Sequence, residues 1–296
     1  MVEAESQRVT VGDLVSKLEA GVKEVTTSDG WRQYLELQSR VHSYSLGNTL
    51  LIMMQRPDAT MVGGFHFWLS VGRHVRKGEH GIRILAPIVT RKPATNDGND
   101  NTGDGDSEER LVRGFRTVTV FDISQTDGDP LPDHPCQKLT TDSERGQWLF
   151  SKLLDIANTD GIAVRTDAED LGAANGAYYP SAHTIAIAVG LSVDQKAKTL
   201  CHELAHSILH RQTDKPRAEQ EAEAEGTAFV VAAWAGLDTS AYSLGYVAEW
   251  ASHKDGPAMV KRVGGTIQKT ASTIIDKLEE VEGKSKTKSR ANVDCA

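Results

Sequence analysis

The chain has 296 residues, a length sufficient for two domains of ordinary size. Its formal net charge is -8 at pH 7, and 39% hydrophobic with 25% charged residues is the balance of a soluble globular protein. No run approaches the ~18 apolar residues of a membrane-spanning helix, and the first residues, with Glu3 and Glu5 and no apolar stretch, do not resemble a secretory signal. Three scattered cysteines without CxxC spacing argue against a disulfide framework, so we expect a cytoplasmic protein.

The first half of the chain contains a basic segment that the overall negative charge conceals. Residues 31–92 hold nine Lys or Arg and three Asp or Glu, whereas residues 93–109 hold six acids and no base. Lysines and arginines neutralise DNA phosphates, and an acidic run rich in Gly, Asn and Asp is typical of a disordered surface loop. Whether this acidic loop folds back over the basic segment is left open.

Apolar periodicity predicts helices at 31–45, 46–55 and 65–71. A glycine-bounded basic loop that starts at Gly72 then runs into an apolar strand ending at Pro87, and residues 113–123 supply a further strand. Aromatic rings stack on bases while cations follow the backbone of a single strand. The candidate DNA-binding residues are Phe67, Trp68, Arg73, Arg76, Lys77 and Arg83. The competing interpretation is that aromatic residues at helical spacing pack in the core.

A second domain is predicted after a proline-rich connector at 130–135. Its pattern indicates a helix at 144–157 and strands at 162–165 and 184–188, joined through 176–181. The strand at 182–188 either forms a free edge along which an extended peptide binds or is an ordinary sheet strand.

From Pro257 a long helix is predicted, with apolar residues spaced by threes and fours. Such a helix could form a dimer seam. We expect it to pack on its own domain instead, because Gly264 and Gly265 weaken a freestanding coil. The lysine-rich tail from 284 is predicted to be disordered.

The most specific chemical signal is an HExxH pattern at residues 202–206. Apolar residues recur every fourth position around it, so the segment is predicted to be a helix on which His202 and His206 share one face. Two imidazoles on one face can bind a zinc ion, which lowers the pKa of a water. Glu203 lies beside them and can take a proton as that water attacks a carbonyl, so the motif predicts a zinc hydrolase with Glu203 as the catalytic base.

A catalytic zinc site needs a third protein ligand. His210 continues the row of histidines, but eight residues of straight helix place it about 12 Å from His202, too far to share the ion. A group that stabilises the oxyanion is expected opposite the metal. Tyr179, Tyr242 and Tyr246 are candidates, and the sequence does not rank them.

A further helix, predicted from residue 217 onward, carries the remaining acids. Its apolar residues define an inner face, and stepping back by helical turns places Glu221 and Glu225 on that face. Glu219 and Glu223 are predicted to face solvent. We choose Glu221 as the metal ligand and Glu225 as the acceptor that orients an imidazole N–H, although the sequence allows the two roles to be exchanged.

These residues resemble the zincin-like peptidases of the ImmA/IrrE kind, which pair HExxH with a Glu on a following helix. The run from Trp31 through Pro87, together with 115–126, is similar to the N-terminal domain of antirestriction proteins of the ArdC type over most of residues 10–132. This resemblance implies an N-terminal domain that binds single-stranded DNA and a C-terminal zincin-like metallopeptidase domain. The matching positions are Asn48, Gln55, Pro57, Trp68, Gly72, Arg73, Val75, Lys77, Gly78, Glu79, Gly81 and Ile82, and for the metal His202, Glu203, His206 and Glu221.

The expected architecture is therefore α+β with two domains. A small DNA-binding module covers 10–132 and includes the acidic loop at 93–109, a zincin-like helical and β domain covers 140–283, and a tail covers 284–296. The expected cofactor is Zn²⁺, and the expected partners are single-stranded DNA and a protein or peptide substrate. Two alternatives stay open: a DNA-protection protein whose metal is structural, and a regulatory zinc protease whose N-terminal domain binds protein.

Overall fold

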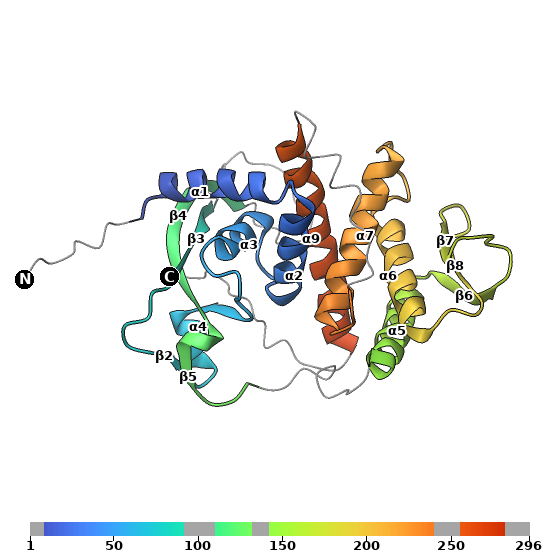
Figure 1. Cartoon of the computed structure of the whole chain (residues 1–296), viewed down its shortest axis with the longest axis horizontal. Coiled ribbons are helices and arrows are strands. Elements are labelled where there is room, and N and C mark those ends of the chain that lie inside the picture. Colours follow the sequence, from blue (N-terminus) through green and yellow to red (C-terminus); the bar gives the residue numbers. More distant parts are fainter. Residues whose placement is uncertain (1–8, 92–109, 132–141, 240–254, 282–296) are drawn as a thin grey trace, which may run out of the picture.

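The computed structural model describes residues 9–91, 110–131, 142–239 and 255–281. The acidic loop, the tail, Tyr242 and Tyr246 lie outside the described residues. Helices and strands are both abundant, which confirms the predicted α+β class. Figure 1 shows the N-terminal helices and a long hairpin on one side of the molecule and a small sheet on the other, with the long helix α9 (Gly256–Val281) between them.

The N-terminal half contains three helices that begin at hydroxyl side chains. The oxygens of Thr10, Thr27 and Ser45 each accept a hydrogen bond from a backbone N–H in the first turn, which satisfies one of the donors that a helix start leaves unpaired. The helices are α1 (Val11–Glu24), α2 (Ser28–Arg40) and α3 (Leu46–Met53). The helix predicted at 31–45 therefore begins earlier and ends five residues sooner, and the one predicted at 46–55 is confirmed with a slightly shorter C-terminus.

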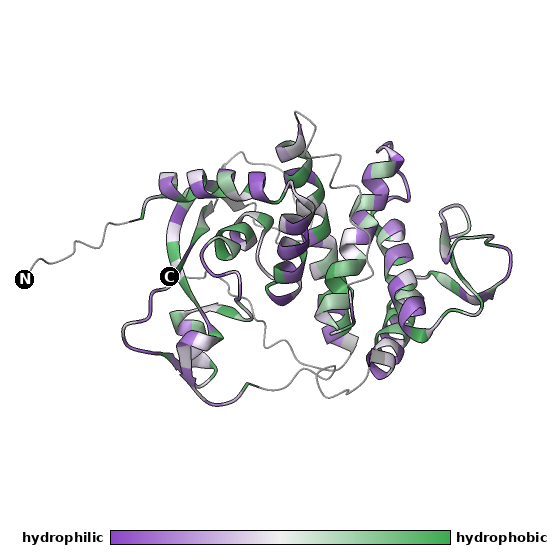
Figure 2. Cartoon of the chain, in the orientation of Figure 1, coloured by the Kyte–Doolittle hydropathy of each residue, from purple (hydrophilic) through white to green (hydrophobic). Residues whose placement is uncertain are grey.

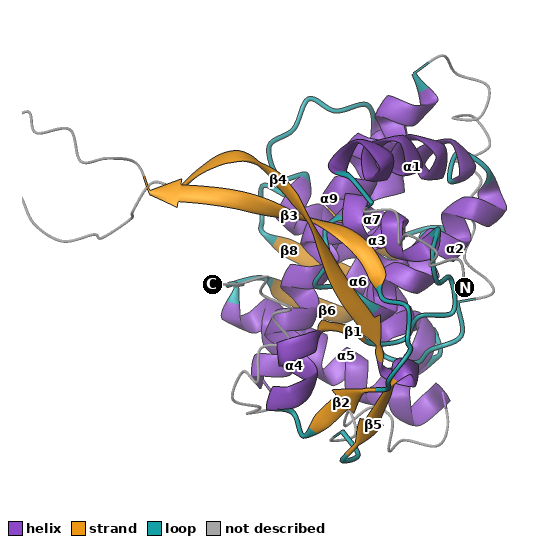
Figure 3. Cartoon of the chain, turned by 90° about the vertical axis from the view of Figure 1, so that its left-hand side faces the viewer, coloured by secondary structure: helices purple, strands orange, loops and turns teal. Residues whose placement is uncertain are grey.

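A three-stranded antiparallel sheet follows, in the order β1-β4-β3. Its strands are β1 (Val62–Gly64), β3 (Ile82–Arg91) and β4 (Arg110–Asp122). The short helix α4 (Phe65–Ser70) and a two-stranded pair, β2 (Arg73–Val75) with β5 (Thr126–Gly128), lie at one end. Figure 3 shows that the far end of the β3–β4 hairpin projects beyond the helices.

Side-chain amides of α3 and of the turn just after it hydrogen-bond to the edge of β3 that β4 leaves unpaired. The Asn48 amide donates to Leu85 O (2.9 Å) and accepts from Leu85 N (3.0 Å). Gln55 does the same with Arg83, at 2.8 and 2.9 Å. A side-chain amide has the same donor and acceptor as a peptide group, so these residues substitute for a neighbouring strand. This gives a structural reason for two of the residues that the ArdC resemblance carried over.

The second half consists of helices packed against a small mixed sheet. Its elements are α5 (Asp142–Thr159), β6 (Ala163–Ala168), β7 (Gly176–Tyr179), β8 (Thr184–Ala188), α6 (Val193–Leu209) and α7 (Arg217–Trp234). The sheet order is β6-β8-β7, with β8 parallel to β6 and antiparallel to β7. Of the two alternatives for 182–188, the ordinary sheet strand is the one found, because β8 is paired on both sides. The segment predicted as a connection contains the edge strand β7.

The long helix packs on its own predicted domain, as expected, and also on the N-terminal half. Val260, Val263 and Ile267 are fully buried, and α9 contacts α5 and α7 on one side and α1 and α3 on the other. One continuous cluster of buried side chains therefore runs through both predicted domains. Figure 2 shows hydrophobic residues along the second half of α7, which lies inside the molecule. Among the described residues, no helix combines the length and apolar character needed to cross a bilayer.

Removing the Asn48 amide is expected to destabilise the N-terminal half. The substitution Asn48→Leu keeps a similar volume but leaves the partly buried N–H and C=O of Leu85 without their partners, which costs about 1–3 kcal/mol of unfolding free energy. The measurement is denaturant-induced unfolding, with the exposed Ser43→Ala as the control, expected to change by less than about 0.5 kcal/mol. Equal stability of Asn48→Leu and the control would contradict the edge-pairing account.

Two adjacent glycines of α9 are expected to respond in opposite directions. A Cβ on Gly264 would lie 2.8 Å from Leu46 Cδ1 and 3.3 Å from Trp31 Cη2, whereas a Cβ on Gly265 would meet nothing within 4 Å. We expect Gly264→Val to lower the free energy of unfolding by about 1–3 kcal/mol through overpacking. Gly265→Ala should raise it by about 0.5–1 kcal/mol through helix propensity. Similar shifts for both variants would show that α9 does not approach Trp31 this closely.

Candidate metal centre

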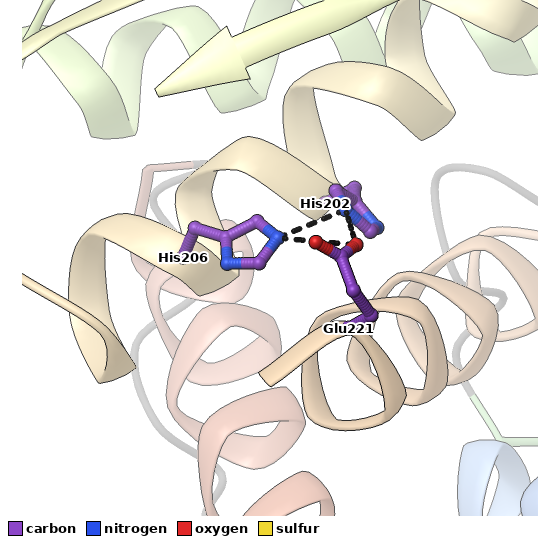
Figure 4. A group of neighbouring side chains, drawn as sticks. All are labelled: His202, His206 and Glu221. Atoms are coloured by element: carbon purple, nitrogen blue, oxygen red, sulfur yellow. Dashed lines mark hydrogen bonds and ion pairs between the residues drawn. The ribbon is translucent and has the colours of Figure 1, made fainter. Parts of the chain in front are cut away.

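The HExxH motif lies on α6, as predicted. Ser192 caps the helix start by accepting from Gln195 N, and Leu200, Cys201 and Leu204 fix one face of the helix in the core. This packing leaves the two motif histidines on the opposite side, with their Nε2 atoms 3.0 Å apart. Figure 4 shows both rings turned toward a common point.

Helix α7 brings a carboxylate to the same point. The Oε2 atom of Glu221 lies 3.5 Å from His202 Nε2 and 3.7 Å from His206 Nε2. These three residues form a group whose potential ligand atoms all lie within 4.8 Å of one another. Glu225, one turn later, lies behind His202, with its Oε2 3.2 Å from Nδ1.

The nitrogen atoms of His202 and His206 and the Glu221 oxygen are spaced like the ligands of one metal ion. Ligands held tetrahedrally at about 2.1 Å from one ion lie roughly 3.4 Å from one another, and the three separations here are 3.0, 3.5 and 3.7 Å. Two imidazoles and one carboxylate are also a donor set that binds zinc and other divalent transition metals. The residues present therefore fit a divalent metal ion, with His202, His206 and Glu221 as the groups that could hold it.

The charged forms of His202 and Glu221 stabilise each other. Burial lowers the pKa of His202, but hydrogen bonds with Glu221 and Glu225 outweigh it and raise that pKa to about 9. Hydrogen bonds from His202 and then His206 hold the pKa of Glu221 far below its usual range. The metal-free centre thus pairs a protonated imidazole with a carboxylate, and a cation can replace that proton.

Glu203 faces a cleft beside the histidines. Its side chain is largely buried, and burial raises its pKa although the two motif histidines and the backbone of Tyr178 oppose the shift. The cleft has a volume of about 270 Å³ and is lined by Asn175, Gly176, Gln195, Lys198, Thr199, His202, Glu203 and Glu225. A Cβ on Gly176 would lie 3.2 Å from Glu203 Cγ, so β7 runs directly alongside this acid.

The prediction that Glu219 and Glu223 face solvent is wrong. The Glu223 side chain is fully buried and contacts His210 and Lys215, and Glu219 accepts two 2.9 Å hydrogen bonds from Arg262 of α9. Both acids are covered because α7 is surrounded by α2, α6 and α9 and therefore has little outer face. The sequence signal for the burial of Glu223 was its position between two alanines, Ala222 and Ala224.

His210 also has a role that its spacing did not reveal. It is buried at the end of α6, with Nδ1 2.8 Å from His206 Nδ1 and Nε2 2.9 Å from Glu223 Oε2. It does not contribute to the group of potential ligand atoms, in agreement with the distance argument.

Among the remaining candidates, Tyr179 is exposed at 38% at the end of β7, and the neighbouring Tyr178 hydroxyl lies 3.0 Å from His183 Nδ1. Cys201 is buried on the core side of α6, and burial raises the pKa of its thiol, so it is a packing residue.

Both predicted DNA-binding aromatic residues, Phe67 and Trp68, pack against other parts of the fold. Trp68 is fully buried and its indole N–H donates to Phe121 O at 3.0 Å, so it offers no face to a base, and its prediction as a stacking residue is wrong. Phe67 is half-buried and lies over Gly63, where a Cβ would come within 2.2 Å of its ring. Core packing, the competing interpretation, accounts for both.

The predicted basic residues differ in their surroundings. Arg73 donates to Thr126 and to backbone carbonyls of β5 and the residue after it, and Arg76 pairs with Glu79 at 2.7 Å. Arg83 donates to the Thr119 hydroxyl across the hairpin. Lys77 is exposed. These arginines therefore stabilise the fold around β2, β5 and the hairpin, whatever else they bind.

Comparison with known proteins gives two family matches in this order along the chain. Residues 5–121 match the N-terminal domain of anti-restriction factor ArdC, and residues 159–243 match the IrrE N-terminal-like domain. An uncharacterized protein of Bacillus anthracis is 26% identical over 276 residues, which cover 81% of this chain and 47% of that protein. The chain thus spans about half the length of this relative.

Two solved structures are similar, both of the antirestriction protein ArdC from the R388 plasmid. The metal-free structure is 20% identical, with a TM-score of 0.47 over 80% of this chain and 85% of that one. The Mn(II)-bound structure is 20% identical, with a TM-score of 0.45 over 79% and 84%. The chain therefore matches an ArdC-type N-terminal domain followed by an IrrE N-terminal-like domain.

Proposed function

We propose that this protein binds single-stranded DNA through its N-terminal half and hydrolyses peptide bonds at a divalent-metal centre formed by α6 and α7. The observation that carries the proposal is the convergence of two imidazoles and one carboxylate beside a buried acid in an open cleft. The match of residues 5–121 to the N-terminal domain of anti-restriction factor ArdC supports an antirestriction role for the chain.

In the proposed reaction, His202, His206 and Glu221 hold the metal, for which we favour Zn²⁺. A bound metal ion supplies a Lewis acid that polarises a carbonyl and makes water acidic near neutral pH. Glu203, which lies in the cleft beside these groups, accepts the proton of the attacking water on its carboxylate and passes it to the leaving amine. Burial, which raises the pKa of this acid, brings it closer to the range in which it can perform both steps.

The edge strand β7 is the proposed binding surface for the peptide. Within the described residues it pairs with β8 on one side only, and Asn175 and Gly176 line the cleft. A free edge offers backbone donors and acceptors that an extended peptide can pair with. Gly176 allows the chain to approach Glu203 closely, since any side chain there would clash with Thr199.

The projecting end of the β3–β4 hairpin is the proposed DNA contact. Phe115 and Val112 are more than half exposed there, and Arg113 and Arg116 follow the same strand. An exposed ring beside guanidinium groups can stack on a base while the cations approach phosphates. Lys77 is exposed at the other end of β3, in the loop that leads into this strand. The ten residues of β3 span about 33 Å, a length that suits several nucleotides.

Substitution of the proposed catalytic acid should separate binding from chemistry. We expect Glu203→Gln to bind Zn²⁺ within a few-fold of the wild type but to lose hydrolysis of an unstructured protein substrate by about 10²–10⁴-fold, because the base is gone while the ligands remain. His206→Ala should lose both. Wild-type hydrolysis by Glu203→Gln would contradict the proposed role. Unimpaired DNA protection by this variant would favour the alternative of a structural metal.

Metal affinity is expected to depend on pH through His202. Its pKa of about 9 in the metal-free protein means that a proton must leave before the ring can bind a metal. The apparent affinity for Zn²⁺ should therefore rise about tenfold per unit as pH increases from about 6.5, and level off near pH 9. Glu225→Gln, which removes a partner charge, should move the plateau to lower pH, while the exposed Glu169→Gln should not. Constant affinity from pH 6.5 to 9 would refute this coupling.

DNA binding can be divided into stacking and charge. We expect Phe115→Ala to weaken binding to labelled single-stranded DNA by about 1–3 kcal/mol with an unchanged salt slope. Arg113→Gln should reduce the slope of log affinity against log salt by about 0.7, the value for one phosphate contact on a single strand. The control is Phe65→Ala, an aromatic residue of similar exposure on α4. If neither hairpin variant differs from it, the hairpin is not the DNA contact.

A complete lack of DNA binding at low salt would leave the regulatory-protease alternative. In that case the N-terminal half would recognise a protein, and the exposed apolar residues of the hairpin would be the first region to test.

A further inference from the structure

A chain of buried polar groups leads away from the proposed metal centre behind His206. His206 Nδ1 lies 2.8 Å from Nδ1 of His210, and His210 Nε2 lies 2.9 Å from Glu223 Oε2. The other oxygen of Glu223 lies 2.5 Å from Lys215 Nζ. The side chains of His210 and Glu223 are 3% and 0% exposed, so these contacts are shielded from water.

For a neutral His210, the chemistry of these groups allows only one direction of hydrogen bonding. The Lys215 ammonium can only donate and the Glu223 carboxylate can only accept, so the atom of His210 that faces Glu223 must carry a proton. A neutral imidazole carries one proton, and Nδ1 of His210 therefore accepts. Its donor is His206 Nδ1, which leaves Nε2 of His206 as the unprotonated nitrogen.

That nitrogen is the one that points at the centre. His206 Nε2 is 3.0 Å from His202 Nε2 and 3.7 Å from Glu221 Oε2, whereas its Nδ1 faces away toward His210. A ligand imidazole needs its lone pair on the metal side and a hydrogen-bond acceptor on the other. We propose that Lys215, Glu223 and His210 form a positioning relay that fixes the tautomer and ring orientation of His206 before a metal arrives. This inference rests on the proposed metal site.

The two motif histidines are supported differently. His202 Nδ1 contacts Glu225, whose side chain is 29% exposed and lines the open cleft. The relay of His206 runs through two buried residues, His210 and Glu223, to Lys215 at the end of the loop before α7. A buried acceptor cannot be replaced by water, so loss of the relay should cost more than loss of an exposed partner.

The test compares metal affinity in the full-length protein by competition with a chelator, using Zn²⁺ alone as the probe. We expect His210→Phe, which keeps the ring but cannot accept, to weaken Zn²⁺ binding by about 10–100-fold. His210→Asn can place an amide oxygen near the position of Nδ1, so it should recover a large part of the loss. Glu223→Gln replaces an acceptor-only carboxylate with an amide that can also present a donor, so it no longer fixes the proton of His210 and should weaken binding about tenfold.

Ser207→Ala is the matched control. Ser207 is buried on the same helix and donates to Leu204 O, but it is not part of the relay. It should change stability without changing Zn²⁺ affinity. Unchanged affinity in both His210→Phe and Glu223→Gln, or an equal loss in Ser207→Ala, would overturn the relay.

A second readout does not require metal. In ¹H–¹⁵N spectra of the metal-free protein, His206 should carry its proton on Nδ1, and the signal should change to a mixture of tautomers in His210→Phe. If the wild-type protein binds no Zn²⁺, the proposed metal site is wrong, and these spectra alone decide whether the relay exists. The same tautomer in wild type and His210→Phe would overturn it.

Discussion

The packing of α7 against α6 is the contact on which the rest of this structure depends. The HExxH helix presents two imidazoles, but the group becomes capable of holding a metal only where Glu221 meets them from a second helix. The relative position of α6 and α7 is set by buried side chains of α7 between Ala222 and Ala232. A shift of one ångström in that packing would separate ligand atoms that now lie within 3–4 Å of one another.

The position of α7 is in turn fixed by both halves of the chain. Helix α9 lies along it, and α2 of the N-terminal half contacts it, with the Arg32 guanidinium 5.6 Å from the centre of the Phe229 ring. Close approach between α7 and α9 requires Gly226, where a Cβ would come within 2.3 Å of Ile267. The N-terminal half and the candidate centre are therefore joined through one core. A change in the N-terminal half has a direct physical route to α7.

Acidic residues of α7 account for much of the chemistry around the centre, and they differ in how deeply their side chains are buried. Glu221 and Glu225 approach the imidazoles from the cleft, and Glu223, on the other side of the helix, is buried among partners that keep it charged. Burial alone would raise the pKa of Glu223, but hydrogen bonds from His210 and Lys215 lower it. A buried carboxylate is stabilising only when its partners are complete. This condition explains why a helix with four acids in seven residues can sit inside the molecule.

The sequence alone determined the elements and the local chemistry. Apolar spacing predicted α6, α7 and α9, and the HExxH spacing determined that two imidazoles and Glu203 share one region, since these properties depend on neighbours within a turn or two. Tertiary structure decided the rest: that β8 is internal and β7 is the edge, that Trp68 is core, and that Glu223 is buried rather than solvated. Each of these depends on which distant segments pack together, and no local period encodes that. Helix α7 is covered on three sides by α2, α6 and α9, whose residues lie as far apart in the sequence as Arg32 and Ile267. This packing decides which acids of α7 reach the centre.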